Sequence, residues 1–446
     1  MNQKLEESIK KSVDLLNSFP KGTPIHLISH VDADGLSSAG IICNALLREN
    51  YQFQATLIRD LSPDFISSLS EESKPLIFCD MGSTQIERLE SLNRKVIIID
   101  HHKPLRESSS DGLVQVNAHL CGIDGTFEAC SASLAYSFAV KLNEKNQWLA
   151  PLALAGAYGD KQVLNGGHNK EVLDTALGNN LVTPKIDLKL DGETVREAIE
   201  KSNDPFFVSY SGKPEPTLDL LNNLGIDPNK PVEELGEEKT EKLSSQLVVE
   251  LIKQEVPSRE IEELRTERFY THFRNCRDIS NLSSMLNACG YLDKPGLGLA
   301  CLLGDKNALE EAIVMQREFK KRILNELLRL EKEGAKELEC FQWIEIEDKK
   351  VASPVINVSV IYLFNGKPLL ALSSQKTNIK VSARATLPML KRGIDLAEAL
   401  KNAAESVGGY GGGHPIASGA TIPLESKAQF LKAVDQLIKK QLKEAD

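Results

Sequence analysis

The sequence HVDADG (residues 30–35) follows the apolar run Pro24–His30, PIHLISH, whose composition predicts a β-strand. His30, Asp32 and Asp34 are spaced by two residues, so they project to one side of an extended chain. Gly35 permits a sharp turn into the segment Gly35–Glu49, whose apolar face predicts a helix. A strand that ends in imidazole and carboxylate groups and leads directly into a helix predicts an α/β fold with a ligand site at the strand end.

Three further strand-like runs follow, and two of them end in similar groups. The runs are Tyr51–Ile58, Lys74–Asp80 and Lys95–Asp100, and the helices expected after them are Ser131–Asn143 and Leu149–Lys161. Short runs of β-branched residues with helices between them predict a parallel sheet that is buried on both faces. The sequence CDMG (79–82) closes the second of these runs and DHH (100–102) the third, while GAYGD (156–160) ends a helical run.

These four motifs together predict a metal site. The carboxyl ends of parallel strands meet at one edge of the sheet, where open α/β folds bind ligands. Aspartate oxygens with histidine nitrogens, and no thiolate, favour manganese, magnesium or iron over structural zinc. The motifs hold enough ligands for two ions, which stabilise the attacking and leaving oxygens of a phosphoryl displacement and activate a water molecule. An aspartate after a strand is ordinarily a turn or capping residue, so the prediction depends on all four motifs occurring together.

The histidines outside these motifs and outside the glycine-rich stretch described below are expected to be structural: His26, His119, His168 and His272. His119 follows a strand-like run, and it is the one among them that this run could bring towards the site.

The middle of the chain has a different character. Between residues 186 and 305, charged helical segments such as Glu233–Lys253 and Ser258–Arg274 are interrupted by five prolines, and no strand is expected: Pro205, Pro214, Pro216, Pro228 and Pro231. Many opposite charges four residues apart in Lys306–Lys336 predict a long helix. We therefore expect an α/β domain over residues 1–185, a helical insertion over 186–305 and a connecting helix over 306–336.

Strand-like runs return after the long helix and predict a second, smaller α/β domain over residues 337–446. The expected strands are Gln342–Glu347, Val355–Phe364, Pro368–Ser373 and Asn378–Ala383, and the expected helices are Leu396–Val407 and Lys427–Lys443, the latter with Ser426 as its N-cap.

A glycine-rich stretch, VGGYGGGHP (407–415), lies between a helix pattern and a strand pattern within this domain. Its position inside a domain argues against a flexible linker. Glycines allow backbone N–H groups to approach phosphate oxygens closely, and His414 adds a side-chain donor. Arg384 ends a strand-like run and could pair with a phosphate bidentately, although a surface arginine alone is ordinarily solvated. The pattern predicts a loop that binds phosphate.

The composition is that of a globular chain. The 446 residues are 41% apolar and 26% charged, and no apolar run approaches the roughly 18 residues of a membrane span. The first residues lack the apolar centre of a signal peptide, so we expect a cytoplasmic protein. Eight scattered cysteines without a CxxC pair predict small buried residues. The net charge of −10 argues against a broad basic surface that grips duplex DNA.

HVDADG, CDMG, DHH and AYGD resemble the four motifs of the DHH phosphoesterase superfamily, and GGYGGGHPIASGA (408–420) resembles the signature of the DHHA1 domain. The resemblance implies one ion held by His30, Asp32 and Asp80 and a second held by Asp34, Asp80, His101 and Asp160. His102 would contact the scissile phosphate, and Asp100 would orient a neighbouring group. A phosphate of the substrate would be held by Arg384, Gly412, Gly413 and His414, with the site in the cleft between the two domains.

The layout, with its helical insertion, resembles the archaeal RecJ-like proteins, whose relatives associate with GINS or a helicase. It leaves no room for the OB-fold of bacterial RecJ. The resemblance implies a manganese-dependent exonuclease with two ions, magnesium being the alternative, that acts on single-stranded DNA and also on RNA in replication or repair and releases nucleoside 5′-monophosphates. Three alternatives are open: an oligoribonucleotide or cyclic-dinucleotide phosphodiesterase, a non-enzymatic replisome scaffold, and a pyrophosphatase. The intact ligand positions argue against the scaffold, and the glycine loop argues against the pyrophosphatase.

Overall fold

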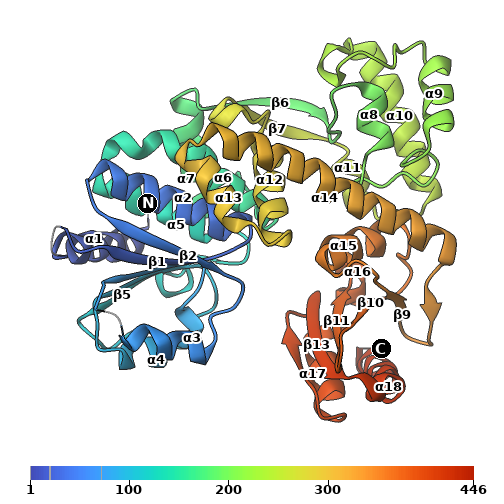
Figure 1. Cartoon of the computed structure of the whole chain (residues 1–446). Coiled ribbons are helices and arrows are strands. Elements are labelled where there is room, and N and C mark those ends of the chain that lie inside the picture. Colours follow the sequence, from blue (N-terminus) through green and yellow to red (C-terminus); the bar gives the residue numbers. More distant parts are fainter. Residues whose placement is uncertain (1, 20–21, 72, 446) are drawn as a thin grey trace. The chain divides into compact units, whose positions relative to one another are not determined.

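A computed structural model describes residues 2–19, 22–71 and 73–445 as two compact units. The N-terminal unit comprises Met1–Lys185 together with Glu267–Arg317, and the C-terminal unit comprises Ile186–Thr266 together with Glu318–Asp446. The chain passes from one unit to the other in three elements, which are labelled in Figure 1: β6 (Val182–Leu188), β7 (Arg265–Thr271) and α14 (Lys306–Glu333). The predicted insertion is thus divided between the two units.

The N-terminal unit is built on a five-stranded sheet in the order β2-β1-β3-β4-β5, in which every neighbouring pair is parallel. This confirms the parallel sheet predicted from the β-branched runs. The strands are β1 (Ile25–His30), β2 (Phe53–Ile58), β3 (Leu76–Cys79), β4 (Val96–Asp100) and β5 (Leu113–Asn117).

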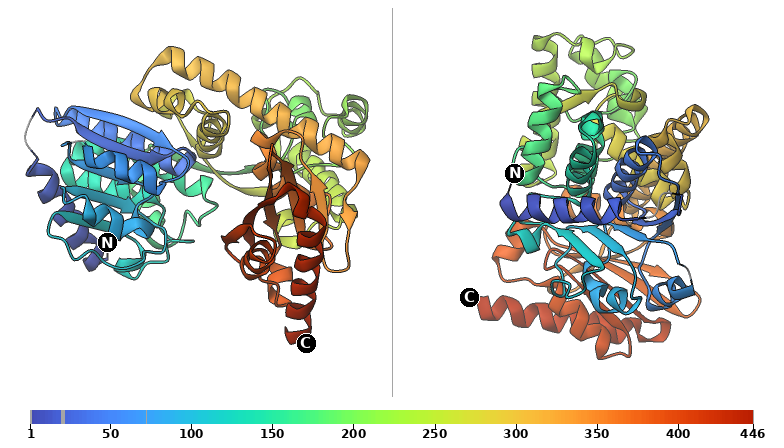
Figure 2. Two further views of the ribbon diagram at one scale, coloured as in Figure 1. Left: turned by 60° about the horizontal axis from the view of Figure 1, so that its bottom comes forward. Right: turned by 90° about the vertical axis from the view of Figure 1, so that its left-hand side faces the viewer.

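Alternate strand residues face two separate helical layers. Ile28, Phe78 and Ile98 are register partners and pack with α3 (Pro63–Ser68) and α4 (Ile86–Ser91). Their neighbours Leu27, Ile77 and Ile97 belong to the larger core on the other face. The helices of this larger core are α1 (Gln3–Asn17), α2 (Ala33–Arg48), α5 (Ser131–Leu142), α6 (Ala150–Gly159) and α7 (Gly167–Gly178). The layers are visible in Figure 1 and from two further directions in Figure 2.

The segment from residue 267 to 317 completes the N-terminal unit. Its helices α12 (Ile279–Tyr291) and α13 (Pro295–Leu303) pack on α2, and α12 also packs on α6. Leu282, Met285 and Leu302 are buried in the same core as the first strands. Residues remote in sequence therefore support the elements that carry the candidate ligands.

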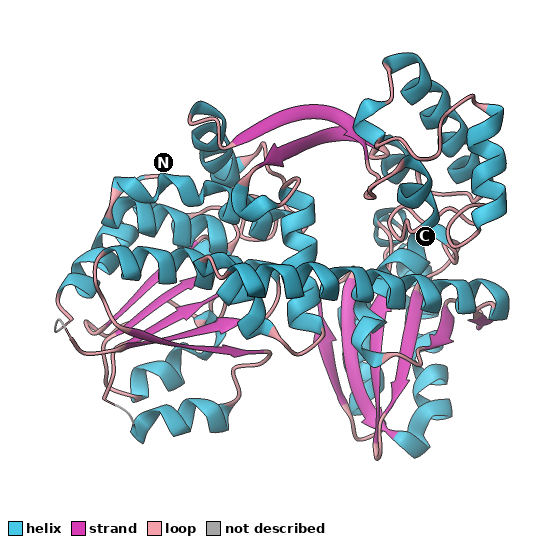
Figure 3. Cartoon of the chain, turned by 45° about the horizontal axis from the view of Figure 1, so that its top comes forward, coloured by secondary structure: helices cyan, strands magenta, loops and turns pink. Residues whose placement is uncertain are grey.

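The prediction of a helix over Ser258–Arg274 is wrong beyond Glu262. Helix α11 spans Ser258–Glu262, and Arg265–Thr271 forms strand β7, which pairs with β6 in a two-stranded sheet (Figure 3). The expectation of no strand in residues 186–305 fails for the same reason. The β-branched and aromatic residues of RTERFYT favour a strand once a partner strand is available, and that partner lies more than 70 residues earlier in the chain.

The C-terminal unit contains a six-stranded mixed sheet in the order β12-β13-β11-β10-β9-β8, in which only β9 and β10 are parallel. This confirms the smaller mixed α/β domain. Helices α17 (Leu396–Glu405) and α18 (Lys427–Ala445) share a core with alternate residues of β10, β11 and β13. The strands are β8 (Lys336–Glu337), β9 (Gln342–Glu345), β10 (Leu369–Ser374), β11 (Asn378–Arg384), β12 (Tyr410–Gly413) and β13 (Ala417–Pro423).

Two further predictions fail in this unit. The expected strand Val355–Phe364 is helix α15 (Ala352–Tyr362), which packs on β10 and β11. A continuous β-branched run fits a buried helix as well as a buried strand, and periodicity cannot separate the two. The glycine-rich stretch, expected as a loop, contains the edge strand β12. The other helices of the unit are α8 (Val195–Glu200), α9 (Pro214–Asn223), α10 (Glu237–Lys253) and α16 (Leu387–Lys391).

All eight cysteines are free and buried, as predicted. Among the described residues, no helix is both long and apolar enough to cross a membrane.

Candidate metal centre

The candidate ligands gather at the carboxyl edge of the parallel sheet. His30 ends β1, Asp80 follows β3, and Asp100 ends β4 directly before His101. Because β1, β3 and β4 are neighbours in the sheet, their ends lie side by side. Asp80 adopts the left-handed conformation with φ of 59°, which aspartate tolerates better than most residues and which is frequent at functional sites.

Helix α2 brings two more carboxylates to this edge. Asp32 is its N-cap and accepts a hydrogen bond from the Gly35 N–H at 3.0 Å, while Asp34 lies in the first turn. The turn predicted at Gly35 therefore occurs earlier, and Gly35 itself is inside the helix. A Cβ at Gly35 would lie 2.4 Å from the His30 carbonyl oxygen, so glycine is needed for close packing of the helix on the strand end.

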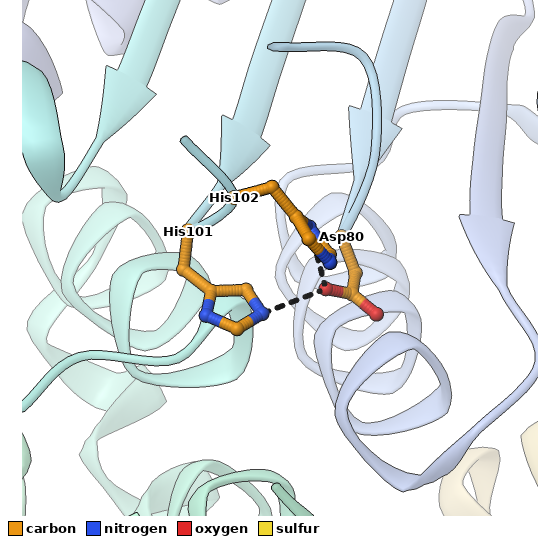
Figure 4. Close-up of side chains that lie close together, drawn as sticks. All are labelled: Asp80, His101 and His102. Carbon is orange, nitrogen blue, oxygen red and sulfur yellow. Dashed lines mark ion pairs between the residues drawn. The ribbon is translucent and has the colours of Figure 1, made fainter. Parts of the chain in front are cut away.

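The side chains form three overlapping groups whose ligand atoms lie within 4.8 Å of one another: His30 with Asp32 and Asp80, Asp34 with His101 and Asp160, and Asp80 with His101 and His102. Asp80 lies between the first two groups. Its Oδ2 is 3.3 Å from His30 Nδ1. Its Oδ1 is 3.4 Å from His101 Nε2, and this second pair is drawn in Figure 4. The structure thus brings together all six residues predicted as metal ligands.

Two distances define the outer sides of these groups. His30 Nδ1 lies 2.9 Å from Asp32 Oδ2, and His101 Nε2 lies 3.2 Å from Asp160 Oδ2. Asp160 caps the C-terminal end of α6, as the fourth motif predicts.

Asp100 and His102 form a pair beside the groups. Asp100 is buried, and its Oδ1 accepts from His102 Nδ1 at 2.8 Å while its Oδ2 accepts from the Ser83 N–H at 3.0 Å. The side chain of His102 is half exposed, and its Nδ1 lies 3.8 Å from Asp80 Oδ1. Asp100 therefore fixes the orientation of an imidazole that solvent can reach.

Several positioning residues were not found from the sequence. Asp34 accepts hydrogen bonds from the Ser131 and Ala132 N–H groups at the start of α5, both at 2.8 Å, and Ser131 Oγ donates to Asp80 Oδ1 at 3.1 Å. His101 Nδ1 lies 2.6 Å from the Gly125 carbonyl oxygen, which leaves Nε2 for the ligand group. Ser131 precedes a helix pattern, and such a position indicates only a helix start.

The side chains of the cluster shift one another's pKa values. Burial, together with the charge of Asp80, raises the pKa of Asp34 to about 7, and burial with the charges of Asp34 and Asp32 raises that of Asp160 well above its usual range. Burial lowers the pKa of His30, but hydrogen bonds to Asp32 and Asp80 outweigh it and raise the pKa to about 11. The crowded carboxylates therefore repel one another, and added positive charge stabilises their ionised forms.

A divalent cation would supply the same positive charge. Oxygen and imidazole donors without thiolate suit manganese or magnesium. The three groups therefore fit divalent ions, and Asp80 is placed to serve two of them. His119 lies at the start of a short 3-10 turn, His119–Cys121, and belongs to none of these groups.

The predicted phosphate-binding residues gather at one end of the sheet in the C-terminal unit. Arg384 on β11 is the register partner of Ala417 on β13, and Ala417 exchanges backbone hydrogen bonds of 2.9 and 3.1 Å with His414. Arg384 on β11, Ala417 on β13 and His414, which directly follows β12, thus form one row. Arg384 Nε donates to Asn357 Oδ1 at 2.5 Å, which holds the guanidinium against α15.

The glycines of this stretch serve two different structural purposes. A Cβ at Gly409 would lie 2.3 Å from the Thr421 carbonyl oxygen, and one at Gly411 would lie 3.0 Å from that of Leu400, so these two allow β12 to pack on β13 and α17. Gly413 has φ of 141°, and Gly412 has open space around it. Because the Gly413–Ser418 pair is out of phase with the hydrogen-bonded His414–Ala417 pair, the Gly413 N–H points away from β13 at the free edge.

Two family models match the chain: "DHH family, N-terminal domain" over residues 24–157 and "DHHA1 domain" over residues 343–440. The chain belongs to the DHH family. The first match covers the strands and motifs of the candidate metal centre, and the second covers the glycine-rich strand. Membership makes this DHH protein a metal-dependent hydrolase of phosphodiester bonds, which confirms the activity class predicted from the motifs.

Similar proteins agree with this membership. An uncharacterized protein of Methanocaldococcus jannaschii is 31% identical over 99% of this chain and 98% of its own. A prophage-derived Bacillus subtilis protein, provisionally named a single-strand DNA-specific exonuclease, is 29% identical, but the match covers 26% of this chain and 20% of that protein.

Two solved structures share the fold. CDC45 from Entamoeba histolytica has a TM-score of 0.68 and 14% identity, with coverage of 98% of this chain and 99% of that one. RecJ from Thermus thermophilus in complex with Mn²⁺ has a TM-score of 0.62 and 17% identity, with coverage of 99% of this chain and 56% of that one. At these identities the likeness concerns the fold alone.

Proposed function

We propose that this DHH protein binds two manganese ions and hydrolyses single-stranded nucleic acid from an end, releasing nucleoside 5′-monophosphates. One ion is held by His30, Asp32 and Asp80, and the other is held by Asp34, Asp80, His101 and Asp160. The observation that carries the proposal is the position of Asp80, whose two carboxylate oxygens approach histidines of different ligand groups, at 3.3 and 3.4 Å. Magnesium is the alternative ion.

The bound ions would supply an activated water molecule and neutralise charge on the phosphodiester. The chain itself supplies orientation. Asp100 accepts the hydrogen bond from His102 Nδ1, and this bond raises the pKa of His102 and so favours the protonated ring. The protonated ring can donate from its opposite nitrogen to a non-bridging phosphate oxygen. Ser131 holds Asp80 and Gly125 holds His101, so two ligands are fixed before any ion binds.

A second phosphate of the substrate would be held in the C-terminal unit. Arg384 offers a planar donor group, His414 an imidazole, and Gly412 and Gly413 a stretch of backbone that substrate oxygens can approach closely. The row formed by Arg384, Ala417 and His414 supports this assignment because it places the two side-chain donors at the same end of the sheet.

Single-stranded DNA is the proposed substrate, with RNA as a second one, in replication or repair. The manganese-bound RecJ structure and the name of the Bacillus subtilis relative support this choice. The net charge of −10 does not argue against this substrate, because a protein that binds through two ions and a few donors does not need the basic surface that duplex binding requires. We further propose a replication or repair protein, GINS or a helicase, as its partner in a cytoplasmic setting.

Digestion of end-labelled substrates tests the proposal. Single-stranded DNA, single-stranded RNA and a dinucleotide are each incubated with the protein and Mn²⁺ or Mg²⁺. We expect mononucleotides from the long single strands, loss of activity in Asp80→Ala, and full activity in the control Asp174→Ala, whose exposed carboxylate on α7 pairs with Lys170.

Each other outcome selects an alternative. Preference for the dinucleotide by orders of magnitude would identify an oligonucleotide hydrolase in place of the proposed exonuclease. Failure to cleave any of the three substrates with either ion would favour the scaffold, which the intact set of carboxylates and imidazoles argues against.

A further inference from the structure

Helix α12 lies against the start of α2, which carries Asp32 as its N-cap and Asp34 in its first turn. Helix α12 belongs to the N-terminal unit although about 250 residues of sequence separate it from the start of α2. The chain enters this segment from β7 and leaves it through α14. Three contacts connect α12 to the candidate metal centre, and each involves backbone or a small residue.

The first contact is a hydrogen bond to the backbone between Asp32 and Asp34. The Ala33 N–H donates to Asn287 Oδ1 at 2.9 Å. Ala33 is the first residue of α2, and N–H groups in the first turn of a helix have no partner within the helix. Asp32 and Asp34 belong to different ligand groups, and Asn287 holds Ala33, the one residue that separates them in the chain.

The second contact is a close approach of backbone to backbone. A Cβ at Gly290 would lie 2.0 Å from the Val31 carbonyl oxygen, so the end of α12 abuts the loop just before Asp32. Arg59, which follows β2, donates to the Gly290 carbonyl oxygen at 2.7 Å and pairs with Asp293 at 2.7 Å. The end of α12 is therefore fixed on both sides.

The third contact is near the fourth motif. A Cβ at Gly159 would lie 2.7 Å from the Ala33 side chain and 3.0 Å from Ser283 Oγ. Gly159 directly precedes the candidate ligand Asp160. Ala33, Gly159 and Ser283 of α12 thus pack closely together. A substitution larger than glycine at residue 159 would push the start of α2, with Asp32 and Asp34, away from the turn with Asp160.

We propose that Asn287 is a positioning residue that sets the spacing between the two metal ions. This inference rests on the proposed two-ion function. Asn287 does so by holding Ala33 and hence the relative placement of Asp32 and Asp34, while Gly290 and Arg59 hold the helix that presents it. Metal binding in this protein then depends on residues 267–317 as well as on the four sequence motifs.

Metal binding, measured without substrate, tests the proposal. Asn287→Leu removes the acceptor at similar volume, Asn287→Asp keeps it, and Ser284→Ala alters the same helix one turn earlier as a matched control. Calorimetric titration with Mn²⁺ alone gives the number of ions and their affinities. Electron paramagnetic resonance of the loaded protein gives the magnetic coupling between the ions, which reports their spacing.

We expect Asn287→Leu to bind Mn²⁺ about 10–100-fold more weakly at one site, the usual cost of losing a group that orients a ligand, and to lose the wild-type coupling. Asn287→Asp should restore the coupling, and Ser284→Ala should match the wild type. A purely structural role would lower the thermal stability without changing the coupling. If Asn287→Leu does not fold, Arg59→Met is tested instead. It removes the Arg59 contacts with Gly290 and Asp293 at the end of α12, and it should weaken the magnetic coupling between the ions.

Failure of the proposed function and failure of the role of Asn287 would give different results. A wild-type protein that binds no Mn²⁺ would overturn the proposed function itself. A wild-type protein that binds two coupled ions, together with an Asn287→Leu variant of the same affinity and coupling, would overturn only the role of Asn287.

Discussion

Asp80→Ala is the change with the largest expected effect on activity. Asp80 is buried, and its two oxygens lie 3.3 Å from His30 and 3.4 Å from His101, which belong to different ligand groups. Its removal should therefore weaken both ions at once. Asp32, by comparison, belongs to one group only, so Asp32→Ala is the matched single-ion variant.

The expected fall in kcat/KM depends on how many ions lose a ligand. Loss of one orienting group costs about 10–100-fold in metal affinity, and this serves as a lower bound for loss of a ligand. Applied to both ions, Asp80→Ala should lower kcat/KM by at least about 10²–10⁴-fold, or about 3–6 kcal/mol at about 1.4 kcal/mol for each tenfold change. Asp32→Ala should lower it by about 10–100-fold when Mn²⁺ is limiting, and excess Mn²⁺ should restore part of its activity.

The assay is release of labelled mononucleotides from a single strand over a range of Mn²⁺ concentrations, with thermal unfolding in EDTA to show that each variant is folded. Partial rescue by Mn²⁺ is expected for Asp32→Ala and not for Asp80→Ala. If Asp80→Ala binds two ions and loses no more activity than Asp32→Ala, the assignment of Asp80 to both ions is wrong.

Three further predictions address the cluster and the substrate. In the metal-free protein, the raised pKa values of Asp34, about 7, and His30, about 11, favour the protonated folded state. The stability from Asp34 is lost as pH rises from about 4 to about 7, and that from His30 is lost as pH rises from 6.5 to about 11. The gain in Tm on adding Mn²⁺, measured by scanning calorimetry, should therefore be larger at pH 8 than at pH 6, and an equal gain at both would contradict this. Arg384→Ala and His414→Ala should each raise KM for a single strand by about 10-fold or more, the effect of losing about 1.5–3 kcal/mol from a charged hydrogen bond, while calorimetric Mn²⁺ binding stays unchanged; a fall in kcat alone would place them elsewhere in the reaction. Asp100→Asn should lower kcat by about 10–100-fold with both ions retained. It should also shift the pH–rate profile to lower pH, because the Asp100 hydrogen bond and charge raise the pKa of His102. An unshifted profile would show that this pair does not act in the rate-limiting step.

The misassigned elements show where sequence patterns lose information. Val355–Phe364 reads as a strand because its residues are β-branched and apolar, yet Ala352–Tyr362 is a helix buried on most of its sides. Periodicity distinguishes helix from strand only when one face is exposed. Arg265–Thr271 was missed for the opposite reason, because its pairing with Val182–Leu188 is a contact distant in sequence.

The candidate ligands could be predicted because the motifs that contain them are local in sequence. His30, Asp32 and Asp34 are adjacent in sequence, DHH is a single triplet, and strand ends in a parallel sheet converge by the geometry of the fold. The reason for Gly35 was misjudged, because the approach of the helix to the His30 carbonyl oxygen is visible only in three dimensions.

The sequence by itself determined the parallel sheet and pointed to the six candidate ligands that the structure brings together, because both depend on neighbouring residues or on the common direction of the strands. Only the tertiary structure decided that Asp80 approaches both ligand groups, that Ser131 and Gly125 hold the ligands in place, and that Asn287 braces the HVDADG loop. The physical reason is that a hydrogen bond between Ala33 and Asn287, 254 residues apart, depends on how the core packs, and no local pattern records that packing. The geometry of the HVDADG motif therefore depends on α12, a helix that lies within the insertion predicted from the sequence.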